Sequence, residues 1–240
     1  MRIVARLTAA ALVFLIYAPL HLASKALLRR SRWPRRFLAA ATGIVGVEVT
    51  IQGGRPGPHS LLLANHLSWL DIVVLGGLGS AFVAKDNLGH GFLHWLADQN
   101  HTVYVRREHR KGARNQAYEI AAALHRDQPV TVFPEGTTGP GTHLLPFRST
   151  LIEAATYAER DVEVRPVALD YGPASAEVTW FGEPGLANLK RILGRKGRMP
   201  VTVHFLPPLS RALDRKAMAL AAREAIAATL AASNSAAPRL

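Results

Sequence analysis

Residues 65 to 71 read NHLSWLD, which places a histidine and an aspartate five positions apart directly after the apolar run SLLLA. A neutral histidine, with an unperturbed pKa of about 6.5, can take a proton from a hydroxyl group at neutral pH. A carboxylate bound to the other ring nitrogen fixes the tautomer and stabilises the protonated ring. His66 and Asp71 are therefore candidates for a base and its orienting partner. The alternative interpretation is structural, with His66 ending a strand and Asp71 capping the helix that follows.

Two further stretches place polar side chains at the ends of predicted strands. FPEGTT, residues 133 to 138, forces a sharp turn in which Gly136 tolerates a backbone geometry that other residues resist, and it presents Glu135. YVRRE places Arg106 and Arg107 at a strand end, where alternation directs them to opposite faces, so at most one should serve a given site. The fork of an arginine suits a phosphate group. The alternative without a function is that Glu135 is an exposed acid in a turn and that the arginines are solvated at the surface.

The elements that must position these residues alternate between strand and helix. This alternation predicts an α/β fold, in which a central, mostly parallel or mixed sheet is flanked by helices and functional residues lie at strand ends. Ser68 is a plausible N-cap, with Asp71 as the acid of a capping box. Strands are expected in residues 47–51, 60–65, 81–85, 102–107, 129–136, 163–171, 176–182 and 201–208. Helices are expected in residues 68–79, 114–127, 149–161 and 211–233.

The N-terminal region carries an uncharged stretch of 17 residues, Leu7 to Ala23. As a helix this stretch covers about 26 Å, against a hydrocarbon core of about 30 Å, so it either barely spans a membrane or lies in the interface. A secretory signal is disfavoured because no convincing cleavage site follows. We expect a membrane anchor or interfacial helix, and the positive-inside rule places the rest of the chain on the cytoplasmic face, in bacteria that of the inner membrane. Six basic residues follow the stretch: Lys25, Arg29, Arg30, Arg32, Arg35 and Arg36.

The composition limits the classes of protein that fit. The 240 residues suit one domain with a small appendage, and a mean hydropathy of +0.09 is high for a water-soluble enzyme. A net charge of +12 attracts nucleic acid, anionic lipid or polyanionic cofactors. The absence of cysteine excludes disulfides, thiolate-metal sites and a cysteine nucleophile.

Four stretches, NHLSWLD, VYVRRE, FPEGTT and VRPVAL, resemble in residue type and order the four motifs of the glycerolipid acyltransferase family, which includes the 1-acyl-sn-glycerol-3-phosphate acyltransferases. The resemblance covers about residues 45 to 210. It implies an O-acyltransferase that moves a fatty acyl group from acyl-CoA or acyl-carrier protein to the free hydroxyl of a lysophospholipid. The leading acceptor is 1-acyl-sn-glycerol-3-phosphate, which gives phosphatidic acid. The organisation expected is a membrane-associating segment (1–40), an acyltransferase domain (41–233) and a tail (234–240).

The resemblance also implies roles for individual residues. His66 is expected to be the general base and Asp71 its orienting partner, with no cofactor beyond the acyl-CoA or acyl-carrier protein co-substrate and no metal. Glu135 is expected to hold Arg107 or to accept a hydrogen bond from the acceptor. The residues expected to bind substrate come from the other three motifs: Arg107, Glu135, Gly136, Thr137 and Pro166.

One departure bears on the acceptor. Many members of the family have arginine where this chain has Thr138, so a phosphate-binding cation is missing there or is supplied by Arg148 in LLPFRS. The stretch FPEGTTGPGTHLLPFRS also resembles a bacterial subgroup that includes lyso-ornithine-lipid acyltransferases, whose acceptor hydroxyl belongs to a 3-hydroxyacyl amide. The two acceptors remain alternatives, and lysophosphatidate leads only through the larger family.

Three interpretations belong to other classes of protein or site. HGFLH places His90 and His94 at the spacing of helical zinc sites, but it lacks the glutamate of H-E-x-x-H. A nucleic-acid-binding protein would explain the charge but shows no recognised motif and leaves the apolar N-terminus without a role, so no nucleic acid is expected as a partner. A non-catalytic membrane-binding protein would be expected to have lost His66 or Asp71. The partners expected are membrane lipid and the acyl donor.

Overall fold

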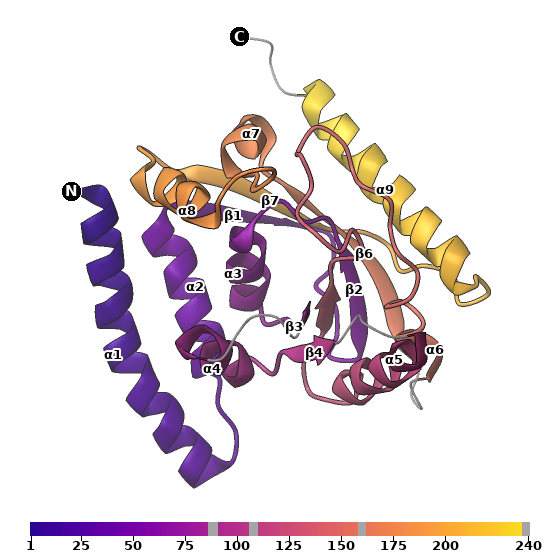
Figure 1. The fold of residues 1–240 in the computed structure, drawn as a ribbon, viewed down its shortest axis with the longest axis horizontal. Coiled ribbons are helices and arrows are strands. Elements are labelled where there is room, and N and C mark those ends of the chain that lie inside the picture. Colours follow the sequence, from indigo (N-terminus) through magenta and orange to yellow (C-terminus); the bar gives the residue numbers. More distant parts are fainter. Residues whose placement is uncertain (86–90, 106–109, 158–161, 237–240) are drawn as a thin grey trace.

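The structure, a computed structural model, describes residues 1–85, 91–105, 110–157 and 162–236. Its strands are β1 (Val47–Gln52), β2 (Ser60–Ala64), β3 (Ala81–Lys85), β4 (Val103–Val105), β5 (Val130–Val132), β6 (Glu163–Asp170) and β7 (Met199–Phe205). Within the described residues these strands form one seven-stranded sheet in the order β1-β7-β6-β2-β5-β3-β4 (Figure 1). All neighbouring pairs are parallel except β6 and β7. The predicted mixed α/β sheet is confirmed.

Strand β2 lies in the middle of the sheet, between β5 and β6. All five of its residues are buried, because helices cover both faces of the sheet at this point. Leu63 is paired with Val132 on one side and with Pro166 on the other. A central parallel strand of this kind reads as an uninterrupted apolar run, as SLLLA does. The strand therefore delivers Asn65 and His66 to the edge of the sheet where parallel strands end.

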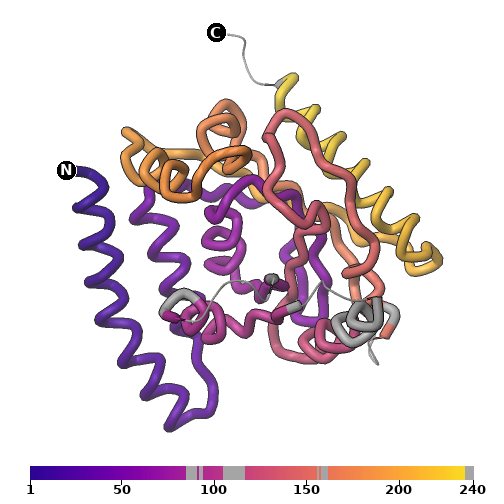
Figure 2. Tube along the Cα trace, viewed as in Figure 1, coloured from indigo at the N-terminus to yellow at the C-terminus, as the bar shows by residue number. Residues whose placement is uncertain are grey.

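Helices cover the two faces of the sheet in different numbers of layers (Figures 1 and 2). On one face, α3 lies next to the sheet, α2 packs on α3, and α1 forms the outer layer. On the other face lie α5, α6 and the long C-terminal helix α9. The helices are α1 (Arg2–Leu28), α2 (Trp33–Val45), α3 (Trp69–Leu78), α4 (Phe92–Gln99), α5 (Arg110–Leu124), α6 (Ala154–Tyr157), α7 (Ser175–Val178), α8 (Gly185–Gly194) and α9 (Arg215–Ala236), with a 3₁₀ turn at Gly172–Ala174.

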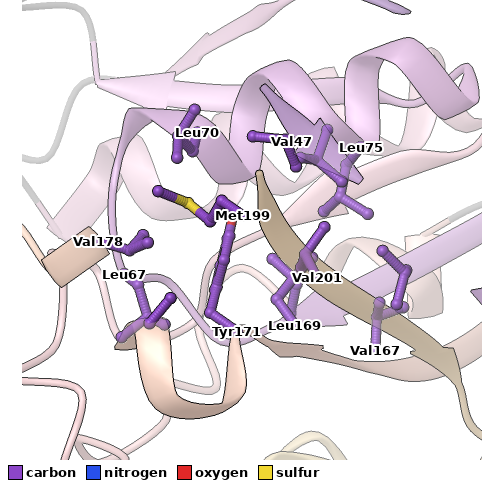
Figure 3. Close-up of a cluster of buried hydrophobic side chains, with 14 of the residues drawn as sticks. Val47, Leu67, Leu70, Leu75, Val167, Leu169, Tyr171, Val178, Met199 and Val201 are labelled. Carbon is purple, nitrogen blue, oxygen red and sulfur yellow. The ribbon is translucent and has the colours of Figure 1, made fainter. Parts of the chain in front are cut away.

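The sheet separates two apolar cores. Figure 3 shows the core on the α3 side, where Leu70 and Tyr171 are fully buried beside Met199. The core on the α9 side includes Ile120 of α5 and Ala222 of α9, both also fully buried. Because the ends of β2 and β6 lie between these cores, the backbone that precedes the NHLSWLD motif is fixed from both faces.

The prediction of a strand over residues 176–182 is wrong. The chain forms α7 and then an irregular loop, because its backbone polar groups bind partners outside the sheet. The N–H of Trp180 donates to the carbonyl of Leu67 at 2.7 Å. The carbonyl of Val178 accepts from Nδ2 of Asn188 at 3.1 Å. The loop thereby packs against the NHLSWLD motif, although its aromatic and β-branched residues have strand propensity.

The predicted helix over residues 149–161 is shorter in the structure. Turns occupy residues 149–153, and α6 begins at Ala154. Residues 158–161 lie outside the described part of the chain. The predicted domain boundary at residue 40 stays a prediction, and α2 passes through that position.

Helix α1 is longer than its uncharged centre, with 27 residues, and it is long and apolar enough to cross a membrane. Its inner side is fixed to the domain, since Nη1 of Arg6 donates to the carbonyls of Ile192 and Leu193 at 3.0 and 2.9 Å. The buried ring of His21 contacts Ser31 Oγ and Gln99 Oε1. The outward side carries large exposed apolar residues: Val4, Leu7, Leu12, Leu15, Ile16, Leu20, Leu22, Leu27 and Leu28.

Candidate active site

Asp71 contacts His66 and caps α3 with the same carboxylate. Its Oδ2 accepts hydrogen bonds from Nδ1 of His66 at 2.8 Å and from the N–H groups of Leu67 and Ser68 at 2.6 and 2.9 Å. Ser68 is the N-cap of α3 and forms the predicted capping box with Asp71. The two interpretations of the motif are therefore not alternatives, because the cap that starts the helix also places the carboxylate beside the histidine.

Tyr171 completes the hydrogen bonding of this carboxylate. Its hydroxyl donates to Oδ1 of Asp71 at 2.8 Å, and both residues are fully buried. Burial and the negative charge of Asp71 raise the pKa of Tyr171 well above its usual value, so the hydroxyl keeps its proton. Sequence reasoning missed this residue. The only local signal was its position just after the fourth motif, 100 residues away from Asp71.

Replacement of Tyr171 by phenylalanine should lower the free energy of unfolding by about 1–3 kcal/mol, because it leaves the buried Oδ1 of Asp71 without a donor. Chemical denaturation of the two proteins measures this difference. Tyr157→Phe is the matched control, since that half-buried hydroxyl donates to Glu153 at 3.3 Å near the protein surface. Equal losses in the two variants would show that the Tyr171 hydroxyl is not required to satisfy Asp71.

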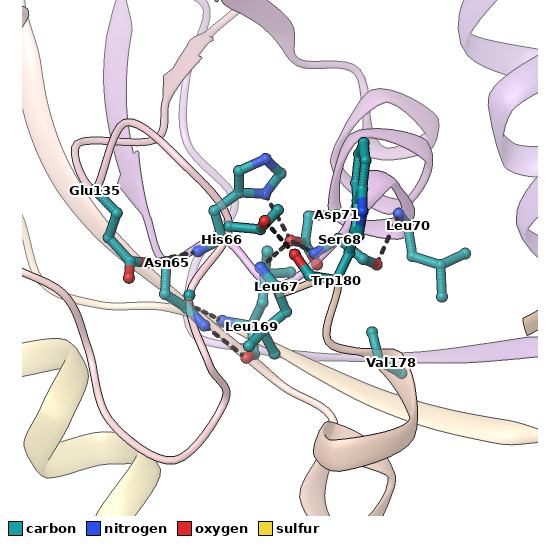
Figure 4. A network of polar contacts seen from close by, with 12 residues as sticks. Asn65, His66, Leu67, Ser68, Leu70, Asp71, Glu135, Leu169, Val178 and Trp180 are labelled. Carbon is teal, nitrogen blue, oxygen red and sulfur yellow. Dashed lines mark hydrogen bonds and ion pairs between the residues drawn. The ribbon is translucent and has the colours of Figure 1, made fainter. Parts of the chain in front are cut away.

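The peptide groups of His66 are held by Glu135 of the FPEG motif and by Gly139, which follows the motif. The N–H of His66 donates to Glu135 Oε1 at 2.8 Å (Figure 4). The N–H of Gly139 donates to the carbonyl of His66 at 2.7 Å. The second oxygen of Glu135 accepts from the N–H of Leu145 at 3.0 Å. Burial raises the pKa of Glu135, and these two N–H groups act in the opposite direction. The described contacts of Glu135 therefore position the backbone of His66.

Gly139 is required for this arrangement because of its close approach to Glu135. A Cβ atom at position 139 would lie 2.8 Å from Glu135 Oε2 and 3.6 Å from the carbonyl oxygen of His66. The carboxylate could move only by giving up one of its two backbone hydrogen bonds. Gly139 lay outside the predicted set, although it lies in the quoted stretch FPEGTTGPGTHLLPFRS.

The imidazole ring of His66 stacks on Phe133, with ring centroids 4.0 Å apart and planes inclined by 15°. This contact and the bond to Asp71 fix the ring. With a carboxylate at Nδ1, the favoured neutral tautomer carries its proton on Nδ1 and leaves a lone pair on Nε2. No residue in the described part of the chain forms a hydrogen bond with Nε2. The arrangement is chemically suited to accepting a proton from a bound hydroxyl.

Asn65 ties the end of β2 to the neighbouring strand β6. Its buried side chain donates from Nδ2 to the carbonyl of Leu169 at 3.1 Å and accepts from the N–H of Leu169 at 2.8 Å. This pair of bonds fixes the spacing between the residue before His66 and the residue before Asp170. The same contacts bring Tyr171 within reach of Asp71.

A cavity of about 280 Å³ adjoins His66. It is bounded by Glu135 and by the loop Gly139–Leu144, by Leu169 and Asp170 at the end of β6, and by α9. Helix α9 is joined to the loop through Arg223, whose guanidinium donates to the carbonyls of the loop; Figure 2 shows the loop running beside the yellow helix. The sequence predicted α9 but gave no sign that it forms a wall of this cavity.

The other residues predicted to bind substrate lie in the turn after β5, within β6 or at the surface, where the structure describes them. Gly136 has a φ of 75°, which requires glycine-like freedom, and its N–H donates to Phe133 in the predicted turn. Thr137 is exposed, and the hydroxyl of Thr138 donates to the carbonyl of Trp180. Pro166 lies inside β6 opposite Leu63, Arg148 is exposed, and neither lines the cavity. Arg106 and Arg107 lie outside the described residues.

The structure gives no support to the zinc-site alternative. His94 lies 3.3 Å from Asp98 and stacks on Tyr104, while His90 lies outside the described part of the chain. Among the described residues, no group of three or more histidine, aspartate or glutamate side chains is placed to hold a metal ion.

Comparison with known proteins identifies the family. The family model described as Acyltransferase matches residues 46–170, more than half of the chain and the region that carries His66, Asp71 and Glu135. The chain belongs to the acyltransferase family. The lyso-ornithine lipid O-acyltransferase of Pseudomonas aeruginosa is 34% identical to this acyltransferase over 204 residues, which cover 82% of this chain and 78% of that protein. The predicted family resemblance is confirmed.

Two further proteins resemble this acyltransferase. The 1-acyl-sn-glycerol-3-phosphate acyltransferase of Neisseria gonorrhoeae is 31% identical over 183 residues, which cover 72% of this chain and 71% of that protein. The crystal structure of the 1-acyl-sn-glycerophosphate (LPA) acyltransferase PlsC from Thermotoga maritima superposes with a TM-score of 0.67 over the whole of both chains, at 18% identity. At that identity the superposition supports the fold of the acyltransferase alone.

Proposed function

We propose that this acyltransferase moves a fatty acyl group from a thioester to the free hydroxyl of a lysolipid, with His66 as general base. The observation that carries the proposal is the pairing of His66 Nδ1 with the buried carboxylate of Asp71 beside a cavity. Membership of the acyltransferase family supports acyl transfer as the reaction, and the names of the two relatives support a lysolipid as the acceptor.

In the proposed reaction, Nε2 of His66 takes the hydroxyl proton of the acceptor as its oxygen attacks the thioester carbonyl. The carbon–sulfur bond then breaks, and the protonated ring returns its proton to the departing thiolate. Asp71 stabilises the charged ring in between and holds it in position. Glu135 and Gly139 act indirectly in this reaction, because they hold the peptide groups of His66 in position.

The acyl donor is proposed to be acyl-CoA or acyl-carrier protein, used in a ternary complex. The chain has no cysteine and no G-x-S-x-G sequence, so neither a cysteine nor a nucleophile-elbow serine is available for a covalent acyl-enzyme. A histidine that activates the acceptor directly needs no such intermediate. The net charge of +12 favours approach of either polyanionic donor.

Lyso-ornithine lipid is proposed as the acceptor. Compared with the Neisseria relative, the lyso-ornithine lipid relative has the higher identity and covers more of this chain. Thr138 stands where many family members have arginine, and its hydroxyl is bound to the Trp180 carbonyl. Arg148, the predicted substitute cation, is exposed and does not line the cavity beside His66. Among the described residues, the cavity therefore has no cation in place of the arginine that Thr138 replaces, because Arg148 does not supply it.

Lysophosphatidate is the second candidate acceptor. The Neisseria relative favours it, with 31% identity over 72% of this chain. Arg107, the arginine predicted from the second motif, lies outside the described residues, so its expected contact with a phosphate group stays a prediction.

We also propose that α1 lies in the plane of the membrane, on its cytoplasmic face. Arg6 and His21 fix one side of the helix to the protein at widely separated points, while the opposite side exposes a row of large apolar residues. Arg29, Arg30 and Arg32 follow at the end of the helix and are exposed, which suits anionic head groups. This placement brings a lipid acceptor close to the protein.

Acyl transfer to two acceptors tests the proposal. The full chain in phospholipid vesicles is offered labelled acyl-CoA or acyl-carrier protein, together with lyso-ornithine lipid or lysophosphatidate. We expect product from lyso-ornithine lipid at a kcat/KM at least about tenfold above that for lysophosphatidate, a difference of roughly 1.4 kcal/mol in transition-state stabilisation. Product from lysophosphatidate alone would establish the second candidate. No product with any pairing would refute acyl transfer to these lipids.

A further inference from the structure

The cavity beside His66 carries an unusual balance of charge for so basic a protein. Among the described residues that line it, the ionic side chains are two carboxylates, Glu135 and Asp170, and one guanidinium, Arg223. The chain as a whole has a net charge of +12. A cavity with this lining is poorly suited to a phosphate dianion and better suited to a group that carries both a positive and a negative charge.

Only one of the two carboxylate oxygens of Asp170 accepts a hydrogen bond from a residue whose contacts are described. Its side chain is 11% exposed, and Oδ1 accepts from the N–H of Gly172 at 2.8 Å. Oδ2 lies 4.0 Å from Nε2 of His204, which is too long for a hydrogen bond. His204 is itself buried, and its Nε2 has no hydrogen-bond partner within the described part of the chain. The sheet thus holds Asp170, which lines the cavity, beside the buried imidazole of His204, which does not.

His204 does not neutralise Asp170 at physiological pH. Burial lowers the pKa of His204, and the carboxylate of Asp170 only partly opposes that effect. The ring is therefore mainly uncharged near pH 7, and the charge of Asp170 has no cationic partner among the residues whose contacts are described. A poorly solvated carboxylate without a cationic partner is stabilised by a ligand that supplies a positive charge.

Arg223 supplies the opposite charge from the other wall. Its Nε and Nη2 donate to the carbonyls of Leu145 and Leu144, at 3.2 and 2.9 Å, and no described carboxylate forms an ion pair with it. The guanidinium is thus oriented by two neutral acceptors and keeps its charge and its remaining donors. An arginine held in this way is suited to a carboxylate ligand.

We infer that Asp170 and Arg223 form the head-group site of this acyltransferase, with Asp170 binding an ammonium group and Arg223 a carboxylate of the acceptor. The inference rests on the proposed function and specifies how its acceptor is selected. Ornithine joined through its α-nitrogen to a 3-hydroxyacyl chain retains one carboxylate and one side-chain ammonium, which matches the two charges. The phosphate of lysophosphatidate has no group that can pair with Asp170.

A comparison of acceptors with and without the ammonium group tests the assignment. Wild type and Asp170→Asn are assayed with lyso-ornithine lipid and with the same lipid acetylated on its side-chain nitrogen. Asparagine keeps the acceptor for the Gly172 N–H, so the local backbone is retained. We expect Asp170→Asn to lower kcat/KM for lyso-ornithine lipid about 10- to 100-fold, mainly through KM, the range for a charged hydrogen bond. With the acetylated lipid, the kcat/KM of Asp170→Asn should equal that of wild type.

Two controls separate this inference from the proposed function. Asp127→Asn removes an exposed carboxylate that does not line the cavity, and it should leave both acceptors unaffected. Lysophosphatidate should be used by Asp170→Asn at least as well as by wild type. If wild type acylates lyso-ornithine lipid while Asp170→Asn lowers kcat/KM for both forms of the lipid equally, the head-group site is wrong and the proposed function stands. If wild type acylates neither lyso-ornithine lipid nor lysophosphatidate, the head-group site and the proposed function are both wrong.

The carboxylate half of the site has its own readout. Arg223→Gln removes the charge while leaving an amide that can still donate to a loop carbonyl. The variant is assayed with lyso-ornithine lipid and with its methyl amide, in which an uncharged amide replaces the carboxylate. We expect a loss of about tenfold or more with the free carboxylate and little with the methyl amide. Equal losses with the two lipids would show that Arg223 only holds the loop.

Discussion

Replacing His66 with alanine should reduce kcat for acyl transfer by about 100-fold or more, the range that general base catalysis contributes. The variant removes an imidazole that lines the described cavity and whose Nδ1 is held by the buried carboxylate of Asp71. Initial rates at saturating donor and acceptor measure the loss. A His66→Ala protein that keeps more than about a third of the wild-type kcat would rule out this residue as the base.

The His66→Ala protein should fold, which makes its activity interpretable. The bonds from Glu135 and Gly139 involve the peptide groups of His66 and survive the substitution. Asp71 loses one donor but keeps the N–H groups of Leu67 and Ser68 and the hydroxyl of Tyr171. The same assay on His125→Ala supplies the control, because that half-buried histidine follows α5 at the opposite edge of the sheet. Its kcat should equal that of the wild type.

The sequence could predict the part of the site that is local in the chain. Ser68 and Asp71 form a capping box three residues apart, and this geometry follows from helix rules alone. His66 lies at the end of an apolar strand whose burial could be read from SLLLA. The turn at Gly136 was also predictable, since its positive φ favours glycine.

The contacts that complete the site were not predictable, because they join residues that are distant in sequence. Tyr171 reaches Asp71 only because β2 and β6 pair in one register, with Ala64 opposite Val167. Periodicity identifies a strand but not its neighbour or its register. The bonds between Asn65 and Leu169 maintain this register and also depend on that pairing.

Contacts between residues distant in sequence also explain two other limits of the prediction. The loop after α7 contains residues of strand propensity, yet Asn188 and Leu67 bind its backbone groups and prevent pairing with the sheet. Helix α9 was predicted from composition, but the residue that it presents to the cavity depends on how it docks against the loop. Arg223 lines the cavity, and its bonds to Leu144 and Leu145 join α9 to the loop.

Asp71→Asn should lower kcat by roughly 10³-fold while the protein remains folded, because the protonated ring of His66 loses the negative charge that stabilises it. Asparagine can direct its oxygen to Nδ1 of His66 and to the N–H groups of Leu67 and Ser68. Its amide then faces Tyr171, whose hydroxyl can accept as well as donate. The ring of His66 thus keeps its position and tautomer, and only the negative charge beside it is removed.

The double variant Asp71→Asn/Tyr171→Phe tests whether this orientation is adopted. Without the hydroxyl, the buried amide introduced at position 71 has no acceptor, so the double variant should be less stable than Asp71→Asn by about 1–3 kcal/mol in denaturant unfolding. Its kcat should stay close to that of Asp71→Asn, because the charge is already absent. If Asp71→Asn retained a tenth or more of the wild-type kcat, hydrogen bonding alone would hold His66 and the negative charge would have little part in the reaction. A loss near 10³-fold in both variants, with stability falling only when Tyr171 is changed, would separate the charge of Asp71 from its role as a cap.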